Sequence, residues 1–174
     1  MYLTLNPEQS FFTLPGYDED LMKDRKFSYH PVAEKRYYSV NLTRISQGER
    51  VVDGDGYLAV IDSGTSVIIG PEHLITEIVT GISVKQDCSN LDSLPTITFT
   101  LNDEGFELDP EDYVMKVSAL GMTSCVLGIM TAALPPGFPY IILGDIFMRR
   151  YYTHFDKGNN RLGFYDAHKL NHSA

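Results

Sequence analysis

One aspartate follows directly on an apolar run, and this junction constrains the chain more than any other feature of its sequence. Residues 58–61 (LAVI) lead into residues 62–65 (DSGT). The run predicts a buried strand that fixes Asp62, while Gly64 lets the backbone approach the carboxylate and the neighbouring hydroxyls can donate hydrogen bonds. Taken alone, the tetrapeptide also fits a plain turn whose aspartate caps a helix near Pro71.

The tetrapeptide occurs once in 174 residues, and the chain has no other Asp-Ser-Gly or Asp-Thr-Gly. Water activation by paired carboxylates needs two aspartates that share one proton, because two like charges about 3 Å apart cannot both ionise. If Asp62 takes part in such chemistry, this sequence holds half of the active site.

Length and composition predict one soluble domain over residues 1–174. The chain is 43% hydrophobic and 21% charged, which is typical of globular proteins. Its net charge of −9 argues against nucleic-acid binding, which depends on Lys and Arg neutralising phosphates. No apolar run approaches 18 residues, so we expect no membrane span, and the first residues lack the basic start and apolar stretch of a signal peptide.

The two cysteines, Cys88 and Cys125, lie 37 positions apart and form no Cys-x-x-Cys motif, so zinc binding by cysteine is not expected. Two isolated buried thiols and a disulfide both remain open at this point. A disulfide would indicate an oxidising compartment. The N-glycosylation acceptors Asn41 and Asn171, in Asn-Leu-Thr and Asn-His-Ser, favour the same secretory route.

The pattern of the chain is mostly β. Period-two alternation and turn residues predict strands at 38–42, 97–101, 106–108, 151–155 and 161–164, with hairpin turns at 102–105 and 156–160. Helical signals are short. They predict a helix with Pro71 as its first residue and apolar positions reaching Ile82, one turn at 110–113 capped by Asp109, and one at 146–149 capped by Asp145.

Other motifs carry less. Residues 53–56 (DGDG) look like a calcium-loop fragment but lack the later ligands, so we interpret them as a hairpin turn. The five histidines form no His-x-x-x-His pair and no serine lies in a Gly-x-Ser-x-Gly elbow, so neither a metal nor a serine nucleophile is expected. Cys125 is a better candidate for a disulfide half than for a nucleophile. No cofactor is expected.

Several blocks of sequence, in order along the chain, resemble a known protein family, which the tetrapeptide alone does not identify. They are 59–66 (AVIDSGTS), Gly70-Pro71, Cys88 through 94–97 (LPTI), 108–113 (LDPEDY), Cys125, 141–156 (IILGDIFMRRYYTHFD) and 159–164 (NNRLGF). Together they cover essentially the whole chain. The sequence resembles the C-terminal lobe of pepsin-like eukaryotic aspartic proteases, of the cathepsin D and plasmepsin type.

The resemblance implies a role for each matching residue. Asp62 corresponds to the second aspartate of the catalytic dyad, and Gly64 supports its loop. Ser63 takes the position whose hydroxyl braces the two active-site loops, and Thr65 the position that hydrogen-bonds the outer oxygen of the aspartate. The hydrophobic-hydrophobic-glycine segment 142–144 packs beside the catalytic loop. The resemblance also implies that Cys88 and Cys125 form the lobe's disulfide. The substrate cleft is expected to be lined by the 135–140 loop, which contains Tyr140, and by Val60, Ser66 and Ile142.

The resemblance also implies fold, activity and partners. The expected fold is mostly β with a few short helices, one lobe of the bilobal acid-protease fold. It includes an early strand at 12–18, in which Pro15 stands where the family usually has a glycine. The N-terminal lobe, with its own aspartate, is absent from the sequence. The whole protein would hydrolyse peptide bonds in an acidic, lysosome- or vacuole-like organelle or after secretion, and would bind peptide substrates and pepstatin-like inhibitors. This chain alone is expected to be inactive and to dimerise through its exposed lobe surface.

Two other functions remain open. A homodimer of the retroviral type would complete the dyad by two-fold symmetry, although the chain is long for that class. A non-catalytic relative of the same fold would serve as a binding domain if the unseen lobe lacks its aspartate. The retained Asp62, with hydroxyls on both neighbours in its loop, speaks against loss of catalysis on this half.

Overall fold

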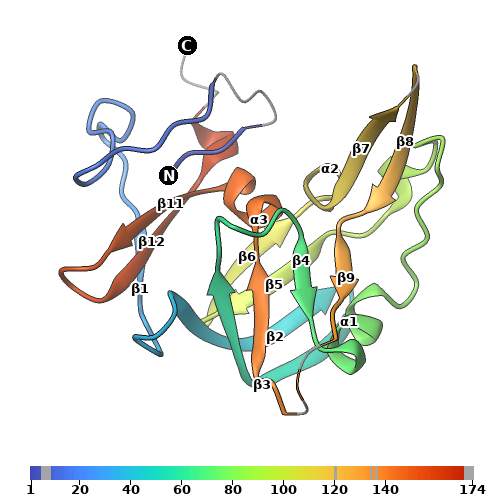
Figure 1. Cartoon of the computed structure of the whole chain (residues 1–174), viewed down its shortest axis with the longest axis horizontal. Coiled ribbons are helices and arrows are strands. Elements are labelled where there is room, and N and C mark those ends of the chain that lie inside the picture. The colour runs from blue at the N-terminus through green and yellow to red at the C-terminus, as the bar shows by residue number, and fades with distance from the viewer. Residues whose placement is uncertain (5–8, 120, 134, 136, 171–174) are drawn as a thin grey trace.

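The computed structural model describes residues 1–4, 9–119, 121–133, 135 and 137–170. The chain is mostly strands with a few short helices, as the resemblance predicted (Figure 1). The described residues form twelve strands: β1 (Ser28–Pro31), β2 (Ser39–Gln47), β3 (Arg50–Ile61), β4 (Ile68–Gly70), β5 (Ile97–Leu101), β6 (Glu104–Leu108), β7 (Val114–Ala119), β8 (Met122–Leu127), β9 (Ile129–Thr131), β10 (Tyr140–Leu143), β11 (Tyr151–Asp156) and β12 (Arg161–Asp166).

Seven strands form the main sheet, in the order β6-β5-β2-β3-β10-β4-β9. Its buried side chains alternate along the strands because successive residues of a strand point to opposite faces. In β5, Ile97, Phe99 and Leu101 have no exposed surface, while the threonines between them are only partly buried. The predicted strand at 97–101 is therefore confirmed, and the hairpin that follows turns through Asn102 and Asp103, both at positive φ (44° and 68°).

The prediction of a hairpin turn at 53–56 is wrong. The turn lies earlier, at Gly48 and Glu49, and residues 53–56 run inside the long strand β3. The pairing of β2 with β3 passes from Leu42–Tyr57 to Arg44–Asp53, so three residues of β3 bulge opposite Thr43. Gly56 accommodates the bulge at a φ of +88°, and this explains a glycine-rich stretch in mid-strand.

A second, three-stranded sheet, in the order β1-β12-β11, lies beside the main sheet (Figure 1). The predicted hairpin of β11 and β12 is confirmed. The amino-terminal segment packs on this sheet, where Tyr2, Phe27 and Tyr152 share a small aromatic core. The predicted strand at 12–18 is wrong: beyond the isolated Tyr2–Phe11 bridge the segment bends, because Pro15 has no N–H to donate to a ladder.

The helices are α1 (Glu72–Val79), α2 (Pro110–Tyr113) and α3 (Asp145–Arg150), with 3₁₀ turns at Leu91–Ser93 and Ala167–Lys169. Helix α1 begins one residue after Pro71 and ends at Val79, short of the predicted Ile82, because Gly81 has a φ of +85°. The cap of α2 is as predicted, with the Asp109 N–H donating to Asp112 Oδ2 at 2.8 Å.

The predicted cap of α3 is wrong by one residue. Gly144 is the cap: its carbonyl accepts from the Met148 N–H at 3.1 Å, and Asp145 is the first helical residue. The Asp145 N–H donates instead to Thr65 O at 2.7 Å, so the start of α3 is tied to the loop that carries Asp62.

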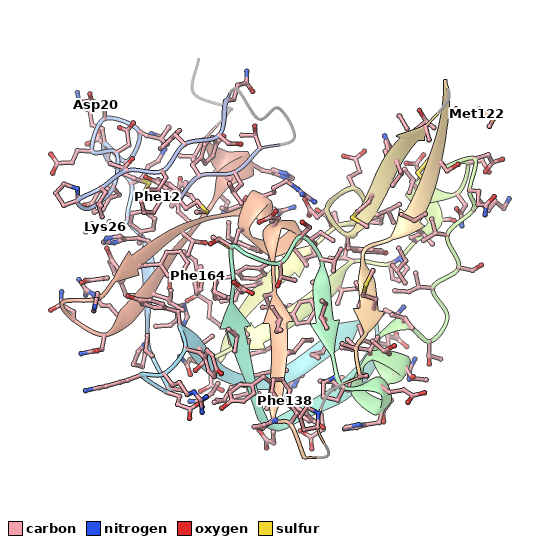
Figure 2. The ribbon with its side chains drawn as sticks, in the orientation of Figure 1. Phe12, Asp20, Lys26, Met122, Phe138 and Phe164 are labelled. Carbon is pink, nitrogen blue, oxygen red and sulfur yellow. A yellow bond between two sulfur atoms is a disulfide. The ribbon has the colours of Figure 1, made fainter. Side chains whose placement is uncertain are left out.

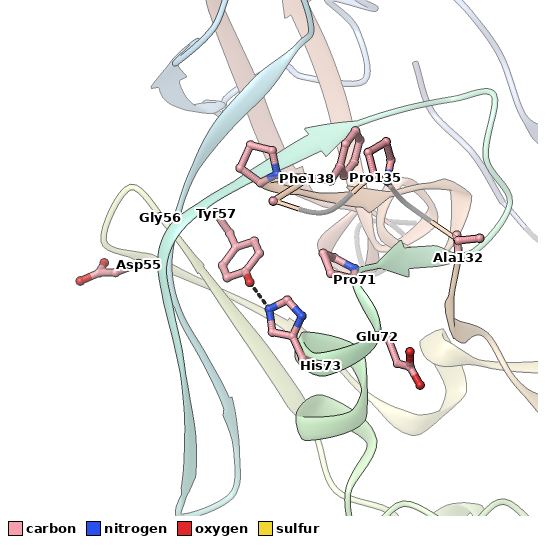
Figure 3. A pocket seen from close by; sticks show the side chains of 12 residues that line it. Asp55, Gly56, Tyr57, Pro71, Glu72, His73, Ala132, Pro135 and Phe138 are labelled. Atoms are coloured by element: carbon pink, nitrogen blue, oxygen red, sulfur yellow. Dashed lines mark hydrogen bonds between the residues drawn. The ribbon is translucent and has the colours of Figure 1, made fainter.

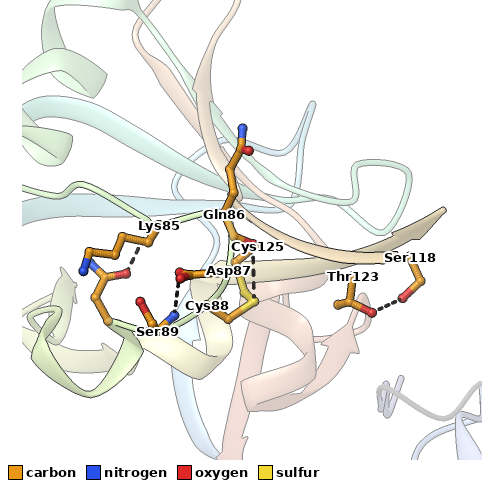
Figure 4. Close-up of a disulfide and its surroundings, with 9 residues drawn as sticks. Lys85, Gln86, Asp87, Cys88, Ser89, Ser118, Thr123 and Cys125 are labelled. Carbon is orange, nitrogen blue, oxygen red and sulfur yellow. Dashed lines mark hydrogen bonds between the residues drawn. A yellow bond between two sulfur atoms is a disulfide. The ribbon is translucent and has the colours of Figure 1, made fainter. Parts of the chain in front are cut away.

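The hairpin of β7 and β8 projects from the body of the fold (Figures 1 and 2) and exposes the side chains of Val117 and Met122. Its base is joined to the segment after α1 by a disulfide between Cys88 and Cys125, with an S–S distance of 2.10 Å (Figure 4). The Cys125 N–H also donates to Gln86 O at 2.9 Å. The cysteine pairing that the resemblance implied is present.

Removing this disulfide is expected to lower the free energy of unfolding by about 4 kcal/mol, because a cross-link over 37 positions restricts the unfolded chain. The double change Cys88→Ser with Cys125→Ser, measured by denaturant unfolding, tests this. Wild-type protein with and without a reducing agent provides the control, and the reductant should have no effect on the double variant. Equal free energies of unfolding for the wild type and the double variant would contradict the expectation.

Candidate active site

Two parallel strands of the main sheet place the candidate site. β3 and β10 are neighbours, with Val60 opposite Ile142 and Ile61 opposite Leu143. Since parallel strands end at the same edge of a sheet, Asp62 and Gly144 emerge together. The Asp62 N–H donates to Leu143 O at 3.2 Å, and the Gly144 N–H donates to Val67 O at 3.2 Å. The loop that carries Asp62 and segment 142–144 therefore lie side by side, as the resemblance implied.

Both carboxylate oxygens of Asp62 accept hydrogen bonds from its own loop. The Gly64 N–H donates to Oδ1 at 2.9 Å, and Thr65 Oγ1 donates to Oδ2 at 2.7 Å. The Thr65 N–H also donates to Asp62 O at 3.3 Å, which closes the turn. The carboxylate is thus held in one orientation while it stays half-buried, and the side chain of Ser63 is exposed.

The carboxyl group of Asp145 lies close enough to feel the charge of Asp62. Burial raises the pKa of Asp145 above its ordinary value, the negative charge of Asp62 acts in the same direction, and Arg149 opposes both. A proton on Asp145 is therefore bound more tightly in the folded protein than in the unfolded chain.

This shift predicts a pH dependence. The pKa of Asp145 is higher in the folded protein than in the unfolded chain. The contribution of this side chain to stability is therefore fully present below about pH 3.9, the unfolded pKa, and is lost as the pH rises through the folded pKa. The free energy of unfolding of the wild type, relative to that of Asp145→Asn, should therefore fall as the pH is raised from about 3 toward neutral. Denaturant unfolding over a pH series measures it, with Asp103→Asn, in a remote turn, as the control. A difference that is flat with pH would contradict the prediction.

A groove opens beside Asp62. It is lined by aromatic and aliphatic side chains together with one arginine and Asp62 itself. Its lining residues are Arg36, Tyr37, Tyr38, Val60, Ile61, Asp62, Phe138, Tyr140 and Ile142. Three of the four predicted cleft residues lie here, namely Val60, Tyr140 and Ile142. Ser66 is exposed in the following turn and is not among the lining residues, so its place in the cleft stays a prediction.

Arg36, Tyr37 and Tyr38 were not predicted. They precede β2, whose Ser39 pairs with Val60, so the register brings them beside the end of β3. The Ile61 N–H donates to Tyr38 O at 2.9 Å, and the ring of Tyr37 meets that of Tyr140 edge to face. The hydroxyl of Tyr140 donates to Glu34 Oε2 at 2.5 Å, which fixes this ring at the groove. In the sequence, only the period-two alternation that begins at Tyr38 indicates that these residues lie near a strand.

A second hollow adjoins the groove through Phe138. It is lined by the bulge of β3, the start of α1 and the loop before β10 (Figure 3). Inside it the hydroxyl of Tyr57 and Nε2 of His73 are hydrogen-bonded, while the carboxylates of Asp55 and Glu72 point away from this pair.

Other predicted features lie away from the groove. Asn41 is exposed on β2, and its Nδ2 donates to Asn102 Oδ1 at 3.1 Å, so its glycosylation stays a prediction. Asn171 lies outside the described residues. Within the described part of the chain, no three His, Cys, Asp or Glu side chains gather in a way that could hold a metal ion. None of the helices described there has the length and apolar character of a membrane-spanning segment.

Comparison with known proteins agrees with this geometry. A family model for eukaryotic aspartyl protease matches residues 1–167. The chain belongs to the eukaryotic aspartyl protease family.

Individual relatives within this family resemble the chain at similar levels. Cathepsin D of Homo sapiens is 36% identical over 182 residues, covering 97% of this chain and 44% of the relative. Cathepsin E of Mus musculus is 33% identical over 179 residues, covering 96% of this chain and 45% of the relative. Cathepsin D of Gallus gallus is 38% identical over 149 residues, covering 79% and 37%. The chain thus spans less than half the length of these relatives.

Proposed function

We propose that the protein carrying this chain is an aspartic endopeptidase and that the chain is its C-terminal lobe, one domain over residues 1–174. The observation that carries the proposal is Asp62, which is held through both carboxylate oxygens at the end of β3, directly after the buried Ile61, and which lines a mostly apolar groove. A carboxylate in this position can take a proton from a bound water. A peptide in the groove would present its scissile carbonyl to that water.

The chemistry needs a second carboxylate. One aspartate takes the proton of water while the other, protonated, donates to the carbonyl oxygen, and a non-covalent tetrahedral intermediate forms. Asp145, the nearest acidic neighbour identified above, is bound into the start of α3, so we propose that the second aspartate comes from an amino-terminal lobe. Family membership and the chain's coverage of less than half of its relatives support this. Ser63, exposed beside Asp62, is the side chain we propose to contact that lobe.

The same arrangement supports the remaining assignments. Pepstatin-like inhibitors would occupy the groove in place of substrate. The disulfide supports an oxidising compartment of the secretory route, and we propose an acidic organelle or the extracellular space as the site of action. Phe12 and Leu14 are 62% and 80% exposed on the amino-terminal segment. We propose that an isolated lobe self-associates through such surface.

Co-production of this chain with an amino-terminal lobe tests the proposal. We expect the pair to cleave peptides at acidic pH, inhibited by pepstatin, and this chain alone to be inactive. Concentration-dependent cleavage by this chain alone, from a preparation free of any other chain, would favour the homodimer. Peptide binding without cleavage by the folded pair would favour the non-catalytic binding domain.

A further inference from the structure

A further recess lies next to the groove beside Asp62. Arg36, Tyr37 and Tyr38 also line this recess, whose other walls include Lys35, Lys157 and Asn160. The two hollows share these three residues and are therefore adjacent, and the recess extends from them to the turn between β11 and β12. The Val32 N–H donates to Asn160 O at 2.9 Å, which holds the β1–β2 connection against that turn (Figure 1).

The charge of this recess is opposite to that of the chain. The net charge is −9, yet the charged side chains that line the recess are all cationic: Lys35, Arg36 and Lys157. All three are exposed, and none takes part in an ion pair with a described acidic residue. The guanidinium of Arg36 lies 5.4 Å from the ring centre of Tyr37, at the junction of recess and groove.

The acidic residues next in sequence are bound elsewhere. Glu34 accepts a hydrogen bond from the Tyr140 hydroxyl at 2.5 Å. Asp156 accepts from Arg161 Nε at 2.7 Å and from Asn159 Nδ2 at 2.8 Å. Both carboxylates are therefore already paired, and the three cations of the recess remain available to a ligand.

We propose that this basic recess, defined by Lys35, Arg36 and Lys157, binds an acidic side chain of the peptide substrate and gives the enzyme a preference for Glu or Asp at one position beside the scissile bond. The inference rests on the proposed peptidase function. A peptide is the ligand that this position favours, because the recess lies next to the groove that holds Asp62 and the shared tyrosines offer walls for its methylene groups. Arg and Lys both donate to carboxylates, and Arg does so in a planar fork.

The preference has a predictable dependence on pH and salt. Lys and Arg stay cationic at acidic pH, whereas a glutamate in a flexible peptide ionises with a pKa of about 4.3. Several charged and titratable groups surround this position. The β1–β2 connection contributes Lys35, Arg36 and the two tyrosines, together with Glu34, which is bound to Tyr140 of the groove. Lys157 and the paired Asp156 come from the β11–β12 turn, and Asp62 lies in the adjacent groove. The preference should rise between about pH 3.5 and 5.5 and weaken as salt is added.

Matched peptides that differ only by Glu or Gln, scanned one position at a time, test this in the two-lobed protein. At about pH 5.5 and low salt we expect kcat/KM about fivefold higher for Glu at one position, as for an exposed charge pair. The triple variant Lys35→Gln, Arg36→Gln and Lys157→Gln, which removes all three cations of the recess, should bring that ratio close to one. Lys116→Gln, exposed on the distant β7 strand (Figure 1), changes charge elsewhere and should keep it.

A binding measurement separates this inference from the proposed function. The Asp62→Asn variant of the two-lobed protein should bind the fluorescently labelled Glu peptide about fivefold more tightly than the Gln peptide, whether or not the wild type cleaves either. Failure to cleave any peptide would overturn the peptidase proposal alone. Equal binding and equal cleavage of Glu and Gln peptides at every position would overturn the basic recess. So would a Glu preference that survives in the triple variant.

Discussion

Asp62→Asn is expected to lower kcat for peptide hydrolysis by the two-lobed protein by about 10³- to 10⁴-fold, the upper range for loss of an acid–base group. The amide has nearly the shape of the carboxylate, so the turn closed by the Thr65 N–H should persist. What is lost is the ability to take a proton from water. Steady-state kinetics at acidic pH gives the rate, and denaturant unfolding shows whether the fold is retained.

Asp103→Asn is the matched control for this change. Asp103 lies in the turn between β5 and β6 at a φ of 68°, a conformation that asparagine adopts readily. The same chemical change should therefore leave both kcat and stability close to wild type. A folded Asp62→Asn protein with more than a tenth of wild-type kcat would show that Asp62 is not the acid–base group.

The parts of the fold that sequence predicts well are local. The hairpins β5–β6 and β11–β12 are confirmed because each joins short alternating strands through residues suited to a tight turn, such as Asn102 and Asp103. The same reasoning failed at residues 53–56, where glycines serve a bulge inside a long strand. A glycine pair marks unusual backbone, and only the pairing with β2 decides whether that backbone turns or bulges.

The candidate site, like the fold, is predictable from the sequence only where its contacts are local. Asp62 and its loop are predictable, because the carboxylate's hydrogen-bond donors lie two and three residues further along the chain. The groove is only partly predictable. Val60, Tyr140 and Ile142 follow from the resemblance, whereas Arg36, Tyr37 and Tyr38 reach it through the register of β2 on β3, which no short motif records. The basic recess depends further on a contact between Val32 and Asn160.

Gly144→Ala is expected to destabilise the chain by about 3 kcal/mol and to disturb the active-site loop. The φ of Gly144 is −88°, which any residue can adopt, so the requirement for glycine comes from close packing. A Cβ at this position would lie 2.0 Å from Thr65 O and 2.6 Å from Val67 O. Both are backbone atoms of the loop that holds Asp62, and they cannot move without breaking the bonds that the Gly144 and Asp145 N–H groups donate to them.

Gly158→Ala is the control for the loss of a glycine. A Cβ there would have Asp156 Oδ1 as its nearest neighbour, at 3.6 Å, so stability should change little or rise slightly because the unfolded chain has fewer conformations. Denaturant unfolding of both variants gives the stability difference. Peptidase assays of the two-lobed protein, at a temperature where Gly144→Ala is still folded, show whether the loop itself has moved. Wild-type stability in Gly144→Ala would mean that segments 62–67 and 142–145 do not pack as closely as described, and the orientation of Asp62 would then need another support.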